Sequence, residues 1–248
     1  MKPGQIFQLG EHRLACGDAK DQELVRQLVD SDRIKLILCD PPYGVAYTES
    51  KAGFTQKLGS TGEITGDHYQ SDDEYRRFTK DWLVVAKPYL TPKNAVYIFN
   101  SDKMIFSLRE GMQDAACRFT QLLVWVKTHA VVGRMDYLPQ HELIAYGWFG
   151  AHEFIKAKDK SLLVYPKPSR SKLHPTMKPV GLLRNLILNS SRVGDVVYDP
   201  FVGSGSTLLA CEQTKRKCVA IELDPKYCQT VIERWQQLTG KEAHRVED

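Results

Sequence analysis

A short apolar run that ends at two prolines is the feature that most constrains the fold of this chain. Residues 34–39 (Ile-Lys-Leu-Ile-Leu-Cys) lead directly into Asp40-Pro41-Pro42-Tyr43. So short a run, rich in Ile and Leu, predicts a buried parallel strand, and the two prolines predict a stiff turn at its end. In open α/β sheets the carboxyl ends of the strands form the ligand-binding edge. The motif therefore predicts a ligand site there, although an ordinary Pro-Pro strand exit with a packed tyrosine fits equally well.

The groups at this corner suit a planar ring that carries an amine. The Asp40 carboxylate and the Pro41 carbonyl oxygen can accept hydrogen bonds from the amine, and the Tyr43 ring can stack on the planar face. Short motifs often match by chance, so this chemistry needs support from other parts of the chain.

Alternating strand and helix patterns run along most of the 248 residues. Strands are expected at 13–16, 34–39, 95–99, 119–126, 142–147, 196–198 and 218–221. Helices are expected at 19–29, 71–86, 103–115, 179–190, 205–213 and 225–238, the second of them opened by a capping box of Ser71 and Glu74. The alternation predicts a three-layer α/β fold around a mostly parallel sheet, and the length fits one domain.

Composition excludes several classes of protein. The six cysteines form no CxxC pair and no zinc-type spacing, so we expect buried thiols and no metal site. No window resembles a signal peptide, and the apolar runs are too short to cross a bilayer. The sequence therefore predicts a cytoplasmic protein without a membrane partner.

A second motif joins a predicted strand to a predicted helix through two glycines. Residues 199–207 read Asp-Pro-Phe-Val-Gly-Ser-Gly-Ser-Thr. Glycines let a ligand lie directly on the backbone, and a helix N-terminus attracts an anionic group. The spacing is neither the dinucleotide fingerprint nor a P-loop. Glu222 ends the next predicted strand, where an acid suits ribose hydroxyls, although a tight turn and a surface acid are the alternatives.

Two further segments differ from ordinary connections. Residues 44–70 form a long glycine-bearing segment, which is either functional or disordered. Residues 156–184 contain eight Lys or Arg against one acid, Asp159, among prolines and serines. This composition predicts a basic loop that contacts phosphates, with a solvated basic face as the alternative.

The motif at residues 40–43 precedes the glycine motif at residues 199–207. Together, and in this order, the motifs resemble those of the S-adenosylmethionine-dependent DNA amino methyltransferases, in the subgroup whose target-amine motif precedes the cofactor motif. Residues 40–43 resemble the catalytic motif of this family, and residues 199–205 its cofactor loop. The His-Pro-Thr-Met-Lys-Pro segment at 174–179 resembles the motif near the cofactor's methionine end. Trp125 with Lys127, and His141 with Glu142, also occupy places where members carry similar pairs. The resemblance covers residues 10 to about 238.

The resemblance implies roles for individual residues. It implies the catalytic residues Asp40, Pro41, Pro42 and Tyr43. It implies cofactor-binding residues, with Asp18 on the adenine amine and Glu222 on the ribose: Asp18, Asp199, Phe201, Gly203, Ser204, Gly205, Thr207, Glu222, Thr176 and Lys178. The basic loop falls where the subgroup places its target-recognition region, which implies DNA contacts from Lys156, Lys158, Lys160, Lys167, Arg170 and Lys172.

The resemblance also implies a fold. It implies a Rossmann-like, sequence-permuted sheet of seven strands in the order 3-2-1-4-5-7-6, with strand 7 antiparallel. The single domain would span residues 1–248, with residues 44–70 as a lid over DNA and residues 150–173 as a small recognition insert. The strands ending at Cys39 and Tyr198 would be neighbours, so that both motifs face one crevice.

The implied function is methyl transfer from S-adenosylmethionine to the exocyclic amine of a flipped base in double-stranded DNA. Asp at the head of the catalytic motif favours N6 of adenine over N4 of cytosine in this family. An N4-cytosine enzyme and a non-catalytic DNA- or cofactor-binding module are the alternatives, and the missing fingerprint disfavours a dehydrogenase. Restriction–modification is a setting known for this family, and a homodimer is one expected assembly.

Overall fold

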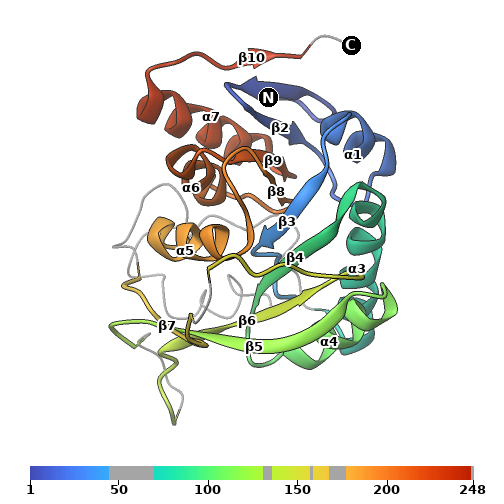
Figure 1. Ribbon diagram of the computed structural model, residues 1–248, viewed down its shortest axis with the longest axis vertical. Coiled ribbons are helices and arrows are strands. Elements are labelled where there is room, and N and C mark those ends of the chain that lie inside the picture. The colour runs from blue at the N-terminus through green and yellow to red at the C-terminus, as the bar shows by residue number, and fades with distance from the viewer. Residues whose placement is uncertain (45–69, 131–135, 157–158, 168–176, 247–248) are drawn as a thin grey trace, which may run out of the picture.

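The computed structural model describes residues 1–44, 70–130, 136–156, 159–167 and 177–246 (Figure 1). Its strands are β1 (Ile6–Leu9), β2 (His12–Cys16), β3 (Ile34–Cys39), β4 (Leu90–Asn100), β5 (Arg118–Val126), β6 (His141–Trp148), β7 (Leu162–Val164), β8 (Val196–Asp199), β9 (Lys217–Glu222) and β10 (His244–Arg245). They form one sheet in the order β10-β1-β2-β9-β8-β3-β4-β6-β5-β7.

The centre of the sheet is parallel and buried on both faces. Strands β2, β9, β8, β3 and β4 each run parallel to the next, and β6 is antiparallel to both β4 and β5. Every residue of β3 is buried, which explains why its sequence is a nearly continuous apolar run instead of an alternating one.

Three helices cover each face of this sheet (Figure 1). One layer contains α1 (Gln22–Val29), α3 (Asp72–Ala86) and α4 (Ile105–Asp114), with the 3₁₀ turn η1 (Lys87–Tyr89) after α3. The other layer contains α5 (Val180–Ser190), α6 (Ser206–Thr214) and α7 (Pro225–Thr239). The predicted three-layer α/β class with a mostly parallel sheet is therefore confirmed.

The predicted number of seven strands is wrong, because the sheet has ten among the described residues. Strands β1 and β10 add an antiparallel edge beside β2, and β7 adds a parallel edge beside β5. These added strands have two to four residues each, too few to show a periodic pattern, and pairing with a longer neighbour defines them. Strand β7 lies inside the segment that was predicted to be a basic loop.

Two local predictions are confirmed. The Ser71 hydroxyl accepts a hydrogen bond from the Glu74 backbone N–H, and the Glu74 carboxylate accepts one from the Ser71 backbone N–H at 2.8 Å, which completes the capping box. All six cysteines are buried free thiols. Among the helices that the structure describes, none combines the length and the apolar character required to cross a membrane.

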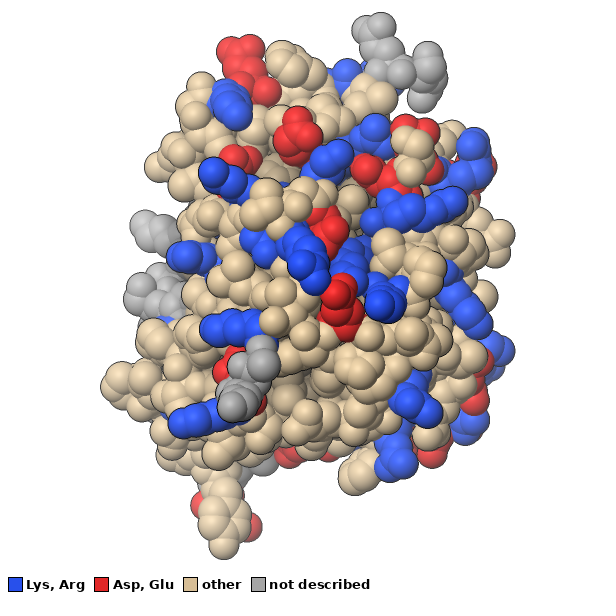
Figure 2. All heavy atoms as spheres, viewed as in Figure 1, with Lys and Arg blue, Asp and Glu red and all other residues tan. Residues whose placement is uncertain are grey.

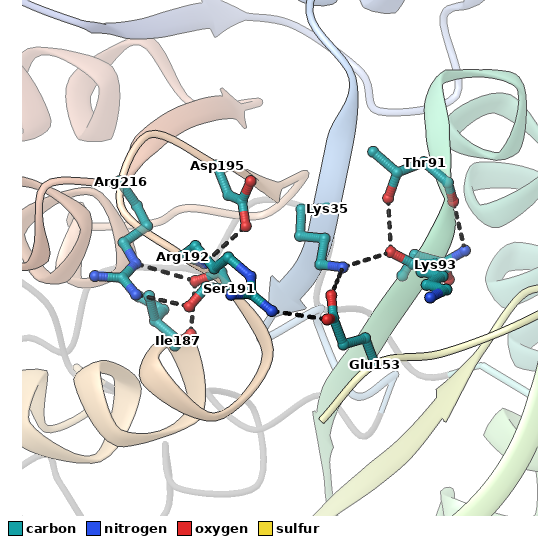
Figure 3. Close-up of polar contacts among 10 residues, drawn as sticks. Lys35, Thr91, Lys93, Glu153, Ile187, Ser191, Arg192, Asp195 and Arg216 are labelled. Carbon is teal, nitrogen blue, oxygen red and sulfur yellow. Dashed lines mark hydrogen bonds and ion pairs between the residues drawn. The ribbon is translucent and has the colours of Figure 1, made fainter. Parts of the chain in front are cut away.

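Ion pairs join side chains near the amino ends of the parallel strands (Figure 3). At the start of β3, the Lys35 ammonium lies 3.0 Å from Glu153, and Arg192, after α5, lies 2.8 Å from the same carboxylate. Figure 2 shows lysines and arginines across the middle of the molecular surface that faces the viewer in Figure 1, with acidic side chains between them. Lys35 is five residues from Asp40, about 17 Å along an extended strand, so this cluster lies at the edge opposite the corner.

A close approach of α3 and α4 gives a test of the packing. A Cβ added at Gly111 in α4 would lie 2.6 Å from the Arg76 carbonyl oxygen of α3. Alanine favours helix over glycine by roughly 0.5–1 kcal/mol, but overpacking of this kind costs about 1–3 kcal/mol. We therefore expect Gly111→Ala to lower the free energy of unfolding measured in urea.

The matched control is Gly181→Ala in α5, where the added Cβ would lie 3.6 Å from Tyr165, an ordinary contact. The free energy of unfolding of this variant is expected to rise by roughly 0.4–1 kcal/mol, because alanine restricts the unfolded chain and its Cβ clashes with no neighbour. Equal stabilisation by both substitutions would contradict the tight α3–α4 contact.

Candidate active site

Strands β3 and β8 deliver the two sequence motifs to the same edge of the sheet. They are parallel neighbours, with Ile37 opposite Tyr198. Strand β3 ends at Cys39 and is followed by Asp40, and β8 ends at Asp199, the first residue of the glycine loop. The Asp-Pro-Pro-Tyr corner and the glycine loop thus leave the sheet at the carboxyl ends of adjacent strands, where α/β folds bind ligands.

Two carboxylates and two ammonium groups surround the corner. Tyr43 donates its hydroxyl proton to Asp40 Oδ1 at 2.8 Å, and the Lys178 ammonium contacts Asp40 Oδ2. Lys178 Nζ also lies 3.2 Å from Glu142 Oε2, and Lys127 Nζ lies 2.7 Å from Glu142 Oε1. The lysine side chains are only 7% and 5% exposed, so these pairs are shielded from solvent.

The charges at this corner depend on one another. Burial raises the pKa of Asp40 and nearby Glu142 adds to this, whereas Lys178 lowers it. Burial would also raise the pKa of Glu142, but Lys178 and Lys127 outweigh it and lower that pKa to about 2. For Lys178, burial lowers the pKa, but the two carboxylates outweigh it and raise the pKa. Glu142 and Lys178 are therefore charged at neutral pH.

Three of these residues have contacts that the sequence did not predict. Lys178, expected at the methionine end of a cofactor, has its ammonium on Asp40 and Glu142, 5.2 Å from the centre of the Phe99 ring. Glu142 and Lys127 had no role assigned from the sequence. A sequence signal for their pairing was available, because Glu142 lies at the start of β6 and Lys127 directly follows β5. These two strands are antiparallel neighbours, with Trp125 opposite Glu142.

The glycine loop has the positive-φ backbone that its glycines allow. Gly203 and Gly205 have φ values of 53° and 87°, and a Cβ at Gly205 would lie 3.0 Å from Val231 Cγ1. The Gly203 backbone N–H donates to Glu222 Oε2 at 2.9 Å, which fixes the carboxylate at the end of β9 beside the loop. Asp18 follows β2 on the next strand, where the Gly17 backbone N–H donates to the Glu222 carbonyl oxygen.

These residues fit a nucleoside-type cofactor with an amino-acid end. Backbone N–H groups of Gly203 and Asp224 each donate to one oxygen of Glu222, and Leu223 supplies a third backbone hydrogen bond. A carboxylate has about four lone-pair sites, so one remains for a ribose hydroxyl. The buried Ser206 hydroxyl at the start of α6 has no hydrogen-bond partner among the described residues. A polar ligand on the loop would satisfy such a group.

Phe201 and Ser204, two further residues expected at the cofactor, contact side chains of the neighbouring helices. The Phe201 ring packs against α3, with ring centres 5.6 Å from Phe78 and 5.5 Å from Trp82. Arg234 of α7 donates to the carbonyl and hydroxyl oxygens of Ser204. These contacts hold the loop in place from both helical layers. Thr176 lies outside the described residues.

Asp199 gives the site a pH-dependent stability. Burial raises its pKa to about 7, although hydrogen bonds from the Thr207 hydroxyl and the Phe201 backbone N–H lower it. Between its ordinary pKa of 3.8 and about 7, the folded protein retains a proton that the unfolded chain has lost. The free energy of unfolding without cofactor should therefore fall as the pH rises through this window, with an upper bound of about 4 kcal/mol.

Urea unfolding at several pH values between about 4 and 8 measures this slope. Asp199→Asn should flatten it, because asparagine does not titrate. The pKa values of Asp40 and Glu222 are also raised, so part of the slope should remain in the variant. An identical slope in both proteins would contradict a buried, protonated Asp199.

The predicted DNA-contacting lysines are only partly within the described residues. Lys156, Lys160 and Lys167 are described and exposed, and Lys156 donates a hydrogen bond to Asn185 of α5 at 3.2 Å. Lys158, Arg170, Lys172 and residues 45–69 of the predicted lid lie outside the described residues. Residues 151–155 run along the edge opposite Asp40, through the contact of Ala151 with Lys93 and the Glu153 ion pairs.

Comparisons with known proteins bear on this arrangement. The type II methyltransferase M.HpaI of Haemophilus parainfluenzae is 27% identical over 252 residues, which cover 90% of this chain and 74% of that protein. The crystal structure of the M1.HpyAVI–SAM complex has a TM-score of 0.64 at 22% identity, covering 89% of this chain and 98% of that one. The PvuII DNA methyltransferase, described as cytosine-N4-specific, has a TM-score of 0.69 at 16% identity, covering 93% and 87%. The two structural likenesses show a shared fold.

A family model supplies the assignment. Residues 34–233 match the family described as DNA methylase of the N6/N4 type. The matched range contains both the Asp40 corner and the glycine loop, the two motifs that β3 and β8 place side by side. Because this range makes up most of the chain, the protein belongs to the N6/N4 DNA methylase family.

Proposed function

We propose that this protein transfers a methyl group from S-adenosylmethionine to the N6 amine of an adenine flipped out of double-stranded DNA. The observation that carries the proposal is the placement of the Asp-Pro-Pro-Tyr corner beside the glycine loop, on adjacent parallel strands. The loop suits the methyl donor and the corner suits an amine on a planar ring. Family membership supports DNA as the substrate.

The corner works by positioning and local charge. The amine of a base is a poor nucleophile, because its lone pair is delocalised into the ring. Asp40 and the Pro41 carbonyl oxygen accept hydrogen bonds from the amine, and Asp40 stabilises the positive charge that develops on its nitrogen. Holding amine and methyl donor in line removes roughly 7–11 kcal/mol of barrier. Flipping the base costs a few kcal/mol, and stacking on Tyr43 returns about 1–3 kcal/mol of it.

The cofactor would be held by residues around the glycine loop. Bound S-adenosylmethionine supplies an electrophilic methyl group on a sulfonium, so no metal is needed for activation. Glu222 would accept from a ribose hydroxyl, Asp18 from the adenine amine, and Asp199 would suit the ammonium of the amino-acid end. The fixed Glu222 carboxylate and the tight turn that the positive φ values of Gly203 and Gly205 allow support these roles.

DNA contacts are proposed for the basic segment from Lys156 to Lys172. The exposed side chains of Lys156, Lys160 and Lys167 support a phosphate-contacting surface. We start this segment at Lys156, because residues 151–155 lie at the opposite edge of the sheet. Type II methyltransferases among the relatives support a restriction–modification setting.

N4 of cytosine is the second candidate acceptor. Both amines demand the same geometry at Asp40, and the PvuII methyltransferase, which shares this fold, is described as cytosine-N4-specific. The aspartate at the head of the catalytic motif favours adenine.

The deciding experiment incubates plasmid DNA with isotope-labelled S-adenosylmethionine and analyses the nucleosides by mass spectrometry. Labelled N6-methyladenine is the expected product. Labelled N4-methylcytosine would replace the first candidate with the second, and DNA without label under conditions of proven cofactor binding would overturn the proposal.

A further inference from the structure

Three of the charged groups at the corner form a closed ring of contacts with Tyr43, and they are Asp40, Glu142 and Lys178. Asp40 accepts from Tyr43 on one oxygen and from Lys178 on the other. Glu142 Oε2 lies 3.2 Å from the Tyr43 hydroxyl and 3.2 Å from the Lys178 ammonium. The same two donors therefore lie within reach of both carboxylates.

This ring places the target amine in competition with donors that are already present. Each oxygen of Asp40 has one donor, so the target amine must share an oxygen with Tyr43 or with Lys178. Lys178 is the stronger competitor, because an ammonium–carboxylate contact is charge-assisted. A buried ammonium that lost Asp40 without a substitute would be strongly disfavoured. A second acceptor would therefore let Lys178 withdraw from Asp40 without losing its partner when the amine arrives.

The Glu142 carboxylate lies where it can be that acceptor. Its other oxygen, Oε1, is held by Lys127 at 2.7 Å, which leaves Oε2 directed at Lys178 and Tyr43. Strand pairing fixes its position, because Glu142 in β6 lies opposite Trp125 in β5. Lys127 follows that strand, and its backbone N–H donates to the Gln140 carbonyl oxygen, so both partners are anchored to the sheet.

We propose that Glu142 is a positioning residue that takes over Lys178 from Asp40 when the target amine binds. The role rests on the proposed function and concerns the same site. The exchange leaves Lys178 paired throughout and frees one Asp40 oxygen for the amine. The freed Asp40 oxygen then faces the positive charge that develops on the amine nitrogen.

The test compares two carboxylates that each hold two cations. Glu142→Gln keeps the shape but removes the charge that attracts Lys178, and Glu142→Asp keeps the charge on a shorter side chain. The control is Glu153→Gln, which weakens the pairs with Lys35 and Arg192 at the far edge of the sheet (Figure 3). For each variant, kcat and KM for DNA, the dissociation constant for S-adenosylmethionine and the thermal midpoint are measured.

The expected result for Glu142→Gln is a kcat lowered on the order of 10- to 100-fold, as for misplaced active-site groups. Its cofactor dissociation constant should stay within about twofold of the unsubstituted value, because Glu142 does not touch the glycine loop. Glu142→Asp should recover part of the loss, and Glu153→Gln should keep its kcat.

Three results would overturn the role of Glu142 while leaving the proposed function intact. These are an unchanged kcat in Glu142→Gln, an equal loss in Glu153→Gln, and a loss of kcat matched by an equal loss of cofactor affinity or thermal stability. Failure of the unsubstituted protein to label DNA would instead overturn the proposed function itself, and with it this role.

Discussion

Methyl transfer should fall on the order of 100- to 1,000-fold in kcat when Asp40 is replaced by alanine, while the affinity for S-adenosylmethionine stays nearly unchanged. The Asp40 carboxylate directly follows β3, and its partners Tyr43 and Lys178 belong to the corner, not to the glycine loop. Removing it takes away the acceptor for the amine and the charge that opposes the developing positive nitrogen. Single-turnover kinetics and calorimetric titration of the cofactor measure the two quantities separately.

The control for this variant is Asp40→Asn, which keeps a hydrogen-bond acceptor but loses the charge. It should retain more activity than alanine if orientation of the amine contributes apart from electrostatics. A thermal midpoint measured for each variant separates catalysis from folding, because removing Asp40 leaves the buried Lys178 with Glu142 as its remaining carboxylate. A parallel loss of cofactor binding in Asp40→Ala would show that the acid serves the cofactor instead of the amine.

The second large effect is expected at Glu222. Replacing Glu222 with alanine should weaken S-adenosylmethionine binding about 10- to 100-fold, because a hydrogen bond to a charged group contributes about 1.5–3 kcal/mol. The carboxylate is oriented by the backbone N–H groups of Gly203 and Asp224, so its loss also frees the glycine loop. Isothermal titration calorimetry with the cofactor measures the change directly.

Glu233→Ala is the matched control, since Glu233 is an exposed acid in the second half of α7. It should bind the cofactor like the unsubstituted protein. If Glu222→Ala bound S-adenosylmethionine as tightly as Glu233→Ala, the ribose assignment would be wrong. The kcat of Glu222→Ala at saturating cofactor should remain within about tenfold, because the acid does not contact the amine.

The parts of the fold that were predictable are those with a strong local signal. The continuous apolar run of β3 and the capping box of α3 identify their elements without knowledge of the rest of the chain. The same holds for the glycines before α6, which require φ values that other residues rarely adopt. The short edge strands β1, β7 and β10 lack such a signal, because pairing with a neighbouring strand defines them.

The site was predictable in its two motifs but not in its charge network. Asp40 and Asp199 are 159 positions apart, and the resemblance to a family was needed to expect them on neighbouring strands. The pairing of Lys178 with Asp40 and Glu142 depends on where β6 and the segment before α5 lie in space. The type of a charged residue does not show whether its side chain is buried or exposed. The sequence alone therefore cannot distinguish a buried charge network from a solvated face.

The burial of Lys127 and Lys178 has a consequence for the response to salt. Mobile ions screen exposed charges over about 10 Å at 0.1 M ionic strength, but they hardly reach pairs enclosed by protein. The ring around Glu142 should therefore be indifferent to added salt, whereas attraction between the exposed lysines and a polyanion weakens steeply. Added salt should therefore weaken the association of the protein with a polyanionic substrate and leave the ion pairs of the reacting corner unchanged.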